Sequence, residues 1–317
     1  MTGAKLQVTV TWQRAPRQAV AFILLVVILA TGCIGEKEEP TDADIRIFAS
    51  NYPLAFFAEE ITGNPEWLIL PDIDDDPSIW HPSIEDITAM QQCNVVLLNG
   101  ATYERWLQKV SLSENRTVIT SAPFRDQYLF IEEGPTHSHG PTGEHSDAGT
   151  AFTTWLDLWQ ATQQALMIKN ALVIAGVGRE ENIEANFRKL QFELLLLDST
   201  IMVITRGHSD VPLFASHPVY QYFSRRYRLN IKSVHWEPGS FPDEAIWQKL
   251  ETLHNTHRAA WMIWEDEPLP ESVERLEKMG IQSVVYDPCG NRPDDGDFMT
   301  VMNSNVANLR SLFEHYR

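Results

Sequence analysis

Cysteine is scarce in this sequence of 317 residues, which has only Cys33, Cys93 and Cys289. A disulfide framework is therefore excluded as the basis of the fold. Basic residues are also few, 25 against 43 acidic ones, and the formal net charge is −18. A chain with so little positive charge has no electrostatic footprint for nucleic acid. The sequence also lacks an HExxH motif, a nucleophile elbow and a Gly-rich phosphate loop, so no common catalytic motif points to a reaction.

A hydrophobic run long enough to span a membrane is missing, but a shorter one lies near the N-terminus. Residues 19–32 read AVAFILLVVILATG and follow a stretch with three basic and no acidic residues. About 14 residues fall short of the roughly 20 that a spanning helix needs, so a signal peptide is favoured over a membrane anchor. The stretch Ala30-Thr31-Gly32-Cys33 resembles a lipobox, and we expect cleavage after residue 32 and acylation of Cys33. Residues 33–43 are polar and would form a tether.

The charge of the remaining chain is strongly negative. The three basic residues before Cys33 would be removed with the signal peptide, which leaves 22 basic and 43 acidic residues, or about −21. Such a surface favours a cation or a basic partner, but it would equally keep an exported protein soluble.

Apolar strand-like runs alternate with helical patterns from residue 44 onward. This alternation predicts an α/β fold whose mostly parallel sheets are covered on both faces. Apolar residues at helical spacing from Ile183 to Leu194 predict a long helix, of which some 20 residues would span about 30 Å. We therefore expect two α/β lobes joined by a long linker helix. The expected boundaries are 44–177 for the first lobe, including a His-containing loop at 132–150, 178–203 for the linker helix, and 204–317 for the second lobe.

Three candidate metal ligands stand at the boundaries of predicted elements. His81 lies in a strand-to-helix loop, His217 at the expected start of a helix, and Asp287 at the end of a strand. Each one alone is more often a helix-capping or solvated residue than a ligand. Together, imidazole nitrogens and one carboxylate suit a borderline cation such as zinc.

Several motifs, in order, resemble those of the metal-binding solute-binding lipoproteins of zinc and manganese ABC importers. They are NYPLAFFAEEITG, DPSIWHPSIEDI, NVVLLNGATYERWL, the His-containing loop before TTWLDL, SHPVYQYFSRRYRL, IWEDEP and YDPCGN, and they extend over residues 44–317. The resemblance implies two α/β lobes joined by a single long helix, and a metal ion held between them.

By this resemblance, His81, His217 and Asp287 match the first, third and fourth ligands of the family. A histidine at the third place favours zinc over manganese. The second ligand is a histidine in the family, but here Thr153 occupies its place. A threonine hydroxyl is a poor zinc ligand, so a water molecule or another side chain has to complete the site. His139, His145 and Cys289 are the candidate supplementary ligands.

Two alternatives stay open. Three protein ligands and a water molecule also describe a catalytic zinc, and a zinc-dependent hydrolase would have Glu265 as the nearest candidate general base. A degenerate paralogue would keep the fold and bind another ligand or a protein partner, a reading that the threonine at position 153 supports.

The favoured function is that of an extracytoplasmic lipoprotein that captures a divalent metal ion and delivers it to an ABC import permease. We expect Zn²⁺ rather than Mn²⁺ as the transported ion, and a monomer rather than an oligomer. The protein would be anchored by lipid to a bacterial membrane, on the periplasmic side or the cell surface, and would be no enzyme. Affinity should fall as the pH drops through about 6.5, because imidazoles ligate only when neutral.

Overall fold

The computed structural model describes residues 45–71, 73, 80–131, 137–138, 144–145 and 149–316. All of them lie in one compact unit, residues 40–317. Cys33, the tether and His139 lie outside the described residues. No helix in the described ranges is both long enough and apolar enough to cross a membrane.

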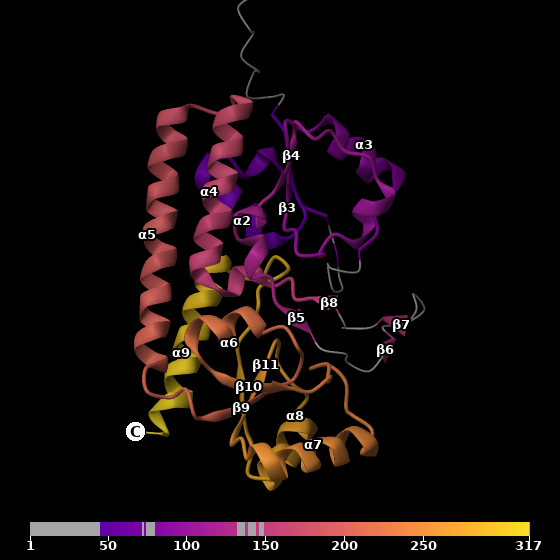
Figure 1. Ribbon diagram of the computed structural model, residues 1–317, viewed down its shortest axis with the longest axis vertical. Coiled ribbons are helices and arrows are strands. Elements are labelled where there is room, and N and C mark those ends of the chain that lie inside the picture. The colour runs from indigo at the N-terminus through magenta and orange to yellow at the C-terminus, as the bar shows by residue number, and fades with distance from the viewer. Residues whose placement is uncertain are drawn as a thin grey trace, which may run out of the picture. The chain divides into compact units, whose positions relative to one another are not determined.

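Two four-stranded parallel sheets organise the chain, as the alternation of strands and helices predicts (Figure 1). The first sheet has the order β2-β1-β3-β4 and the second the order β10-β9-β11-β12. The strands of the first sheet are β1 (Ile47–Ala49), β2 (Leu68–Ile69), β3 (Val95–Leu98) and β4 (Thr117–Ile119). Those of the second are β9 (Pro212–Ala215), β10 (Asn230–Ser233), β11 (Trp261–Trp264) and β12 (Gln282–Val285).

Two short antiparallel pairs lie in the sequence between the sheets. They are β5 (Phe130–Ile131) with β8 (Gly149–Thr150), and β6 (His137–Ser138) with β7 (Glu144–His145). The segment between β5 and β8 contains the His-containing loop. In β6 and β7 the backbone pairs His137 with His145.

Helices cover both sheets and connect them. They are α2 (Tyr52–Thr62), α3 (Ile84–Gln92), α4 (Leu158–Ala175), α5 (Glu180–Thr205), α6 (Gln221–Tyr227), α7 (Glu244–His257), α8 (Pro270–Lys278) and α9 (Phe298–Glu314). Short 3₁₀ segments are η2 (Pro65–Trp67), η4 (Arg105–Lys109), η5 (Ala122–Gln127) and η7 (Thr154–Leu156).

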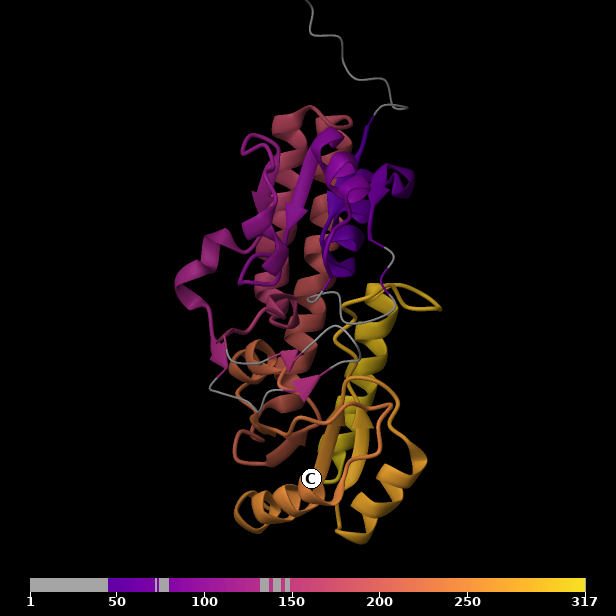
Figure 2. The same ribbon diagram turned by 90° about the vertical axis from the view of Figure 1, so that its right-hand side faces the viewer.

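The long helix α5 runs along both lobes, as expected from its apolar spacing (Figures 1 and 2). It packs against α2 and α4 beside the first sheet and against α9 and α6 beside the second. Its buried residues Ile183, Phe187, Leu190 and Leu194 belong to a continuous apolar core that also contains Ile47 of the first sheet and Ile263 of the second. Because the core is shared, the linker helix is a structural part of both lobes.

Local sequence signals account for the ends of two helices. Ser83 caps α3, and Asp86 completes a capping box by accepting from the backbone N–H of Ser83. Gly63 ends α2 in the left-handed conformation, with φ of 70°.

The helical spacing of Tyr103, Trp106, Leu107 and Val110 predicts a helix over TYERWLQKVSL. This prediction is wrong, because only the five residues of η4 are helical there. Ala101 and Thr102 have φ of 51° and 62°, which an α-helix does not allow. Glu104 turns inward, and its carboxylate accepts from the backbone N–H groups of Asn99 and Gly100. This buried carboxylate holds the chain in a tight turn instead of a helix.

The helix expected to begin at His217 begins later, at Gln221. His217 lies in a bend, where its carbonyl accepts from the N–H of Val219 at 2.9 Å. Pro218 disfavours the helical conformation of the residue before it, which explains the delay. The imidazole is thus carried by a turn at the end of β9.

Candidate metal centre

The carboxyl ends of the second sheet bring together side chains that are far apart in the sequence. His217 follows β9, Glu265 follows β11 directly, and Glu237 lies just beyond β10. Because parallel strands end at the same edge of a sheet, these side chains converge there. One possible ligand atom from each residue lies within 4.8 Å of the other two.

His217 stands at the centre of this group. Its Nδ1 atom is 3.2 Å from a carboxylate oxygen of Glu237 and 3.9 Å from one of Glu265. The side chains of His217 and Glu265 are 14% and 22% exposed, whereas that of Glu237 is 40% exposed. The group is therefore partly sheltered but open to an ion from solvent on the Glu237 side.

Backbone pairing beyond the strand ends fixes the geometry. The N–H of Ser216 donates to the carbonyl of Ile263, and the N–H of Trp236 donates to that of Ser216, both at 2.9 Å. Trp236 and Trp264 are buried in the core of this lobe. Burial of these two indoles orients the adjoining residues Glu237 and Glu265 toward the edge of the sheet.

Negative charge accumulates at this edge. Tyr220 is buried and donates to the carbonyl of Tyr286 at 2.7 Å. Burial raises the pKa of Tyr220 well above its ordinary value, and the carboxylates of Glu265 and Asp287 raise it further. Both carboxylates therefore act on the same phenol, and a bound cation would offset part of their repulsion.

Asp287 follows β12 at the same edge of the sheet. One of its carboxylate oxygens accepts from the N–H of Cys289 at 2.6 Å, and its own N–H donates to Asn305. Burial raises the pKa of Asp287, the hydrogen bond from Cys289 lowers it, and nearby Asp266 raises it. Within the described ranges, Asp287 does not belong to the group formed by His217, Glu237 and Glu265.

His81 is exposed in the loop before α3, two residues ahead of the cap Ser83. Among the described residues, His81 does not belong to the group around His217 either. Of the three ligands expected from the sequence, the structure thus places His217 at the centre of a possible metal site. It does not bring His81 or Asp287 into that group.

The candidate supplementary ligands fare differently. Cys289 is buried and has φ of 56°; burial raises the pKa of its thiol, and the charge of Asp287 raises it further. The described surroundings therefore favour the neutral thiol rather than a zinc-binding thiolate. The backbone of His145 lies in β7, whereas His139 lies outside the described residues.

Thr153 has a structural role that its sequence position did not suggest. Its side chain is buried, and its hydroxyl donates to the carbonyl of Val219 at 2.5 Å. Two residues further on, the indole N–H of Trp155 donates to the carbonyl of Pro288 at 2.7 Å. This segment therefore contacts both loops of the second lobe, the one that carries His217 and the one that carries Asp287.

Sequence reasoning missed Glu237 as a possible ligand, and named Glu265 only as a possible general base. A signal for Glu237 was present: the run Val234-His235-Trp236-Glu237 alternates apolar and polar residues directly after a strand. Such alternation predicts that its polar members, His235 and Glu237, face away from the core.

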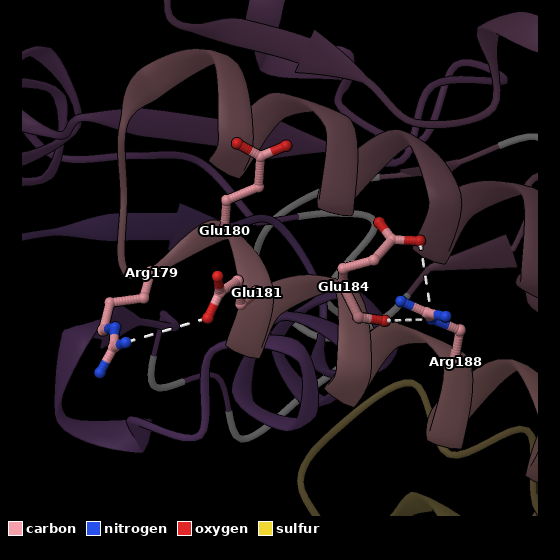
Figure 3. Close-up of a pocket in the computed structure, with 5 residues that line it drawn as sticks. All are labelled: Arg179, Glu180, Glu181, Glu184 and Arg188. Atoms are coloured by element: carbon pink, nitrogen blue, oxygen red, sulfur yellow. Dashed lines mark hydrogen bonds and ion pairs between the residues drawn. The ribbon is translucent and has the colours of Figure 1, made fainter.

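A hollow at the start of α5 is a weaker candidate for a cation site (Figure 3). It is lined by Arg179, Glu180, Glu181, Glu184 and Arg188. Two of its carboxylates already lie near arginines, with 3.9 Å between Arg179 and Glu181 and 3.8 Å between Arg188 and Glu184. Positive charge from these arginines opposes the binding of a cation.

The two lobes, their parallel sheets and the connecting helix define a two-lobe α/β fold. Solved structures share this fold: the Zn(II)-bound ZnuA-like domain of AdcA from Streptococcus pneumoniae has a TM-score of 0.71 at 17% identity. That match covers 84% of this chain and 98% of the other. The metal-dependent lipoprotein YcdH from Bacillus subtilis has a TM-score of 0.70 at 17% identity, with the same coverage.

The family model for ZnuA, "Zinc-uptake complex component A periplasmic", matches residues 47–312, and the chain belongs to this family. The manganese-binding lipoprotein MntA of Halalkalibacterium halodurans is 27% identical over 228 residues, which cover 69% of this chain and 71% of the relative. The high-affinity zinc uptake system protein ZnuA of Bacillus subtilis is 22% identical over 259 residues, 77% of this chain and 80% of the relative.

Membership in this family confirms the resemblance seen in the sequence motifs. The chain is a substrate-binding component of the zinc and manganese importer type and not an enzyme, which sets aside the hydrolase alternative.

Proposed function

We propose that this protein captures Zn²⁺ at the edge of its second sheet and delivers it to an ABC import permease. The observation that carries the proposal is the convergence of His217, Glu237 and Glu265, whose ligand atoms lie within 4.8 Å of one another. One imidazole and two carboxylates provide three of the four ligands of a tetrahedral zinc site. His81 and Asp287, the other ligands expected from the sequence, are candidates for the remaining position.

Zinc is favoured over Mn²⁺ by the imidazole at the centre of the group, since sites built for Mn²⁺ rely more on oxygen ligands. Family members are described for both metals: the Bacillus subtilis relative for zinc and the Halalkalibacterium halodurans relative for manganese.

The N-terminal region would determine where in the cell the protein is located. We infer that residues 1–32 are a signal peptide, that Cys33 is acylated and that residues 33–43 tether the folded part to the outer side of a bacterial membrane. The relative from Halalkalibacterium halodurans is a lipoprotein. We propose a monomer with a first lobe at 44–177, a linker helix at 178–203 and a second lobe at 204–317.

A competitive zinc titration against a chromophoric chelator tests the metal site. Residues 34–317 should bind one Zn²⁺ per chain, and His217→Ala should weaken binding at least a hundredfold, about 2.7 kcal/mol. Glu237→Gln and Glu265→Gln should weaken it in the same direction. His315→Ala is the matched control, because His315 is an exposed histidine on the last turn of the chain, and it should leave the affinity unchanged.

The degenerate-paralogue alternative predicts a different result. Weak binding that is indifferent to His217 would mean that the sheet edge holds no zinc, and this chain would then keep the family's fold without its cargo. The same titration with Mn²⁺ measures the metal preference, and our proposal fails if Mn²⁺ binds more tightly than Zn²⁺.

A further inference from the structure

The strand β10 carries a second histidine toward the candidate metal centre. Beyond β10 the backbone stays paired with the end of β9, since the N–H of Val234 donates to the carbonyl of Ala215 at 2.8 Å and that of Trp236 to Ser216 at 2.9 Å. The side chains of Val234 and Trp236 are 4% and 2% exposed and face the core. In an extended segment alternate residues face opposite sides, so His235 lies on the same side as Glu237.

The two imidazoles lie close together, although His235 is not among the described residues whose ligand atoms lie within 4.8 Å of one another. The ring centroids of His217 and His235 are 6.2 Å apart, with an angle of 69° between the ring planes. A Zn–N bond of about 2.0–2.1 Å and tetrahedral geometry put two ligating imidazole centroids about 5 Å apart. The difference of about 1 Å is within the reach of a small rotation about side-chain bonds.

We propose that His235 is the fourth ligand of the metal site, together with His217, Glu237 and Glu265. This inference rests on the proposed function, and it assigns all four ligands to the carboxyl edge of one sheet. Two imidazoles and two carboxylates match the preference of zinc for mixed nitrogen and oxygen ligands.

The proposal also explains how the site dispenses with a ligand from the first lobe. In the first lobe, the hydroxyl of Thr153 donates to the carbonyl of Val219 and so supports the turn that holds His217. In this arrangement His81 is not needed for affinity. The site is complete within the segment from His217 to Glu265.

Ring-nitrogen NMR of the wild-type protein tests the assignment directly. Long-range ¹H–¹⁵N spectra of residues 34–317 are recorded while one equivalent of Zn²⁺ is added. The ring signals of His217 and His235 should shift together and saturate at one equivalent. Those of His254, which packs against Phe214 on another face, should not move.

Zinc titration of single variants gives the energetic counterpart. His235→Ala should weaken binding at least tenfold, whereas His315→Ala should change the affinity less than twofold. Thermal unfolding of each apo variant shows whether it is folded. The NMR test uses the wild-type protein, so its result holds even if the His235→Ala variant does not fold.

The failures of the two proposals are distinguishable. If His217 shifts and His217→Ala weakens binding, but His235 neither shifts nor matters, the fourth-ligand proposal is overturned and the proposed function stands. If His81→Ala weakens binding as much as His217→Ala, the first lobe supplies a ligand and the single-sheet site is wrong. If the wild-type protein binds no zinc with useful affinity, both proposals fall.

Discussion

The ion pair between Asp198 and Arg226 should be one of the strongest single contributors to the attachment of the linker helix. Asp198 lies in α5, and Arg226 lies in α6, which directly follows the turn of His217. The guanidinium donates two hydrogen bonds to the carboxylate, at 2.9 Å and 2.6 Å, and Tyr227 donates a third at 3.0 Å. The hydrogen bonds to Asp198 are also the largest cause of the raised pKa of Arg226.

Asp198→Ala should lower the free energy of unfolding by about 3 kcal/mol. The side chain of Asp198 is 5% exposed and that of Arg226 24% exposed. Loss of one partner from a buried pair costs about 3–5 kcal/mol, and the partial exposure of Arg226 places this pair at the lower end. In the variant, Arg226 retains Asp157 at 3.7 Å, but the hydroxyl of Tyr227 loses its acceptor.

Urea unfolding followed by circular dichroism measures this effect. At a slope of about 3 kcal/mol per molar urea, the midpoint should fall by about 1 M. Glu274→Ala is the control, because it breaks an ion pair with Lys278 whose side chains are 74% and 75% exposed; it should cost less than about 0.5 kcal/mol.

The double variant Asp198→Leu with Arg226→Met separates the ion pair from simple packing. Removing both charges leaves neither charge of the pair without its partner, although the Tyr227 hydroxyl lacks its acceptor in both variants, so the double variant should be more stable than Asp198→Ala. A loss below about 1 kcal/mol for Asp198→Ala would refute the argument, as would a double variant less stable than the single one.

Three further predictions follow from buried or capped polar groups. Burial raises the pKa of Glu104 above its ordinary value of 4.5, so its contribution to stability is complete below that value and is lost as the pH rises through the folded-state pKa. Glu104→Gln should therefore flatten the pH dependence of urea unfolding above pH 4.5, and an unchanged slope would contradict this. Thr153→Val removes the donor to the carbonyl of Val219 and should cost about 1–3 kcal/mol in the same assay; a neutral effect would argue against the hydrogen bond. Ser83→Ala removes the cap of α3 and should cost about 1 kcal/mol, whereas Ser83→Asp should retain most of that stability.

The sequence predicts the fold well because the fold depends on local periodicity. Alternating strand-like and helical runs predict two parallel sheets, and the spacing from Ile183 to Leu194 predicts the buried face of α5. The failure at η4 has a non-local cause: Glu104 turns inward to the ends of β1 and β3, where its carboxylate accepts from Ser50 and Asn99. Helical spacing alone contains no information about such a tertiary contact.

The composition of the candidate metal centre is harder to predict than the fold. Glu237 follows His217 by 20 residues and Glu265 follows it by 48, so no local spacing joins them. Their proximity depends on the strand order β10-β9-β11-β12, which places β9 between the strands that precede the two glutamates. His217 is identifiable from the sequence because it stands in a motif, but its carboxylate neighbours become visible only when the sheet is assembled.

The contacts between the lobes determine which residues of the first lobe would respond to an ion bound at the proposed site. In the proposed site, all ligands belong to the second lobe, so the ion does not itself bridge the two lobes. The first lobe instead contacts the loops at the site through Thr153, which bonds to the carbonyl of Val219, and Trp155, which bonds to that of Pro288. A shift of the His217 turn on metal binding would therefore reach the first lobe through the hydrogen bond of Thr153. In the proposed arrangement, Thr153, which by resemblance stands at the place of the family's second histidine, would connect the first lobe to the site.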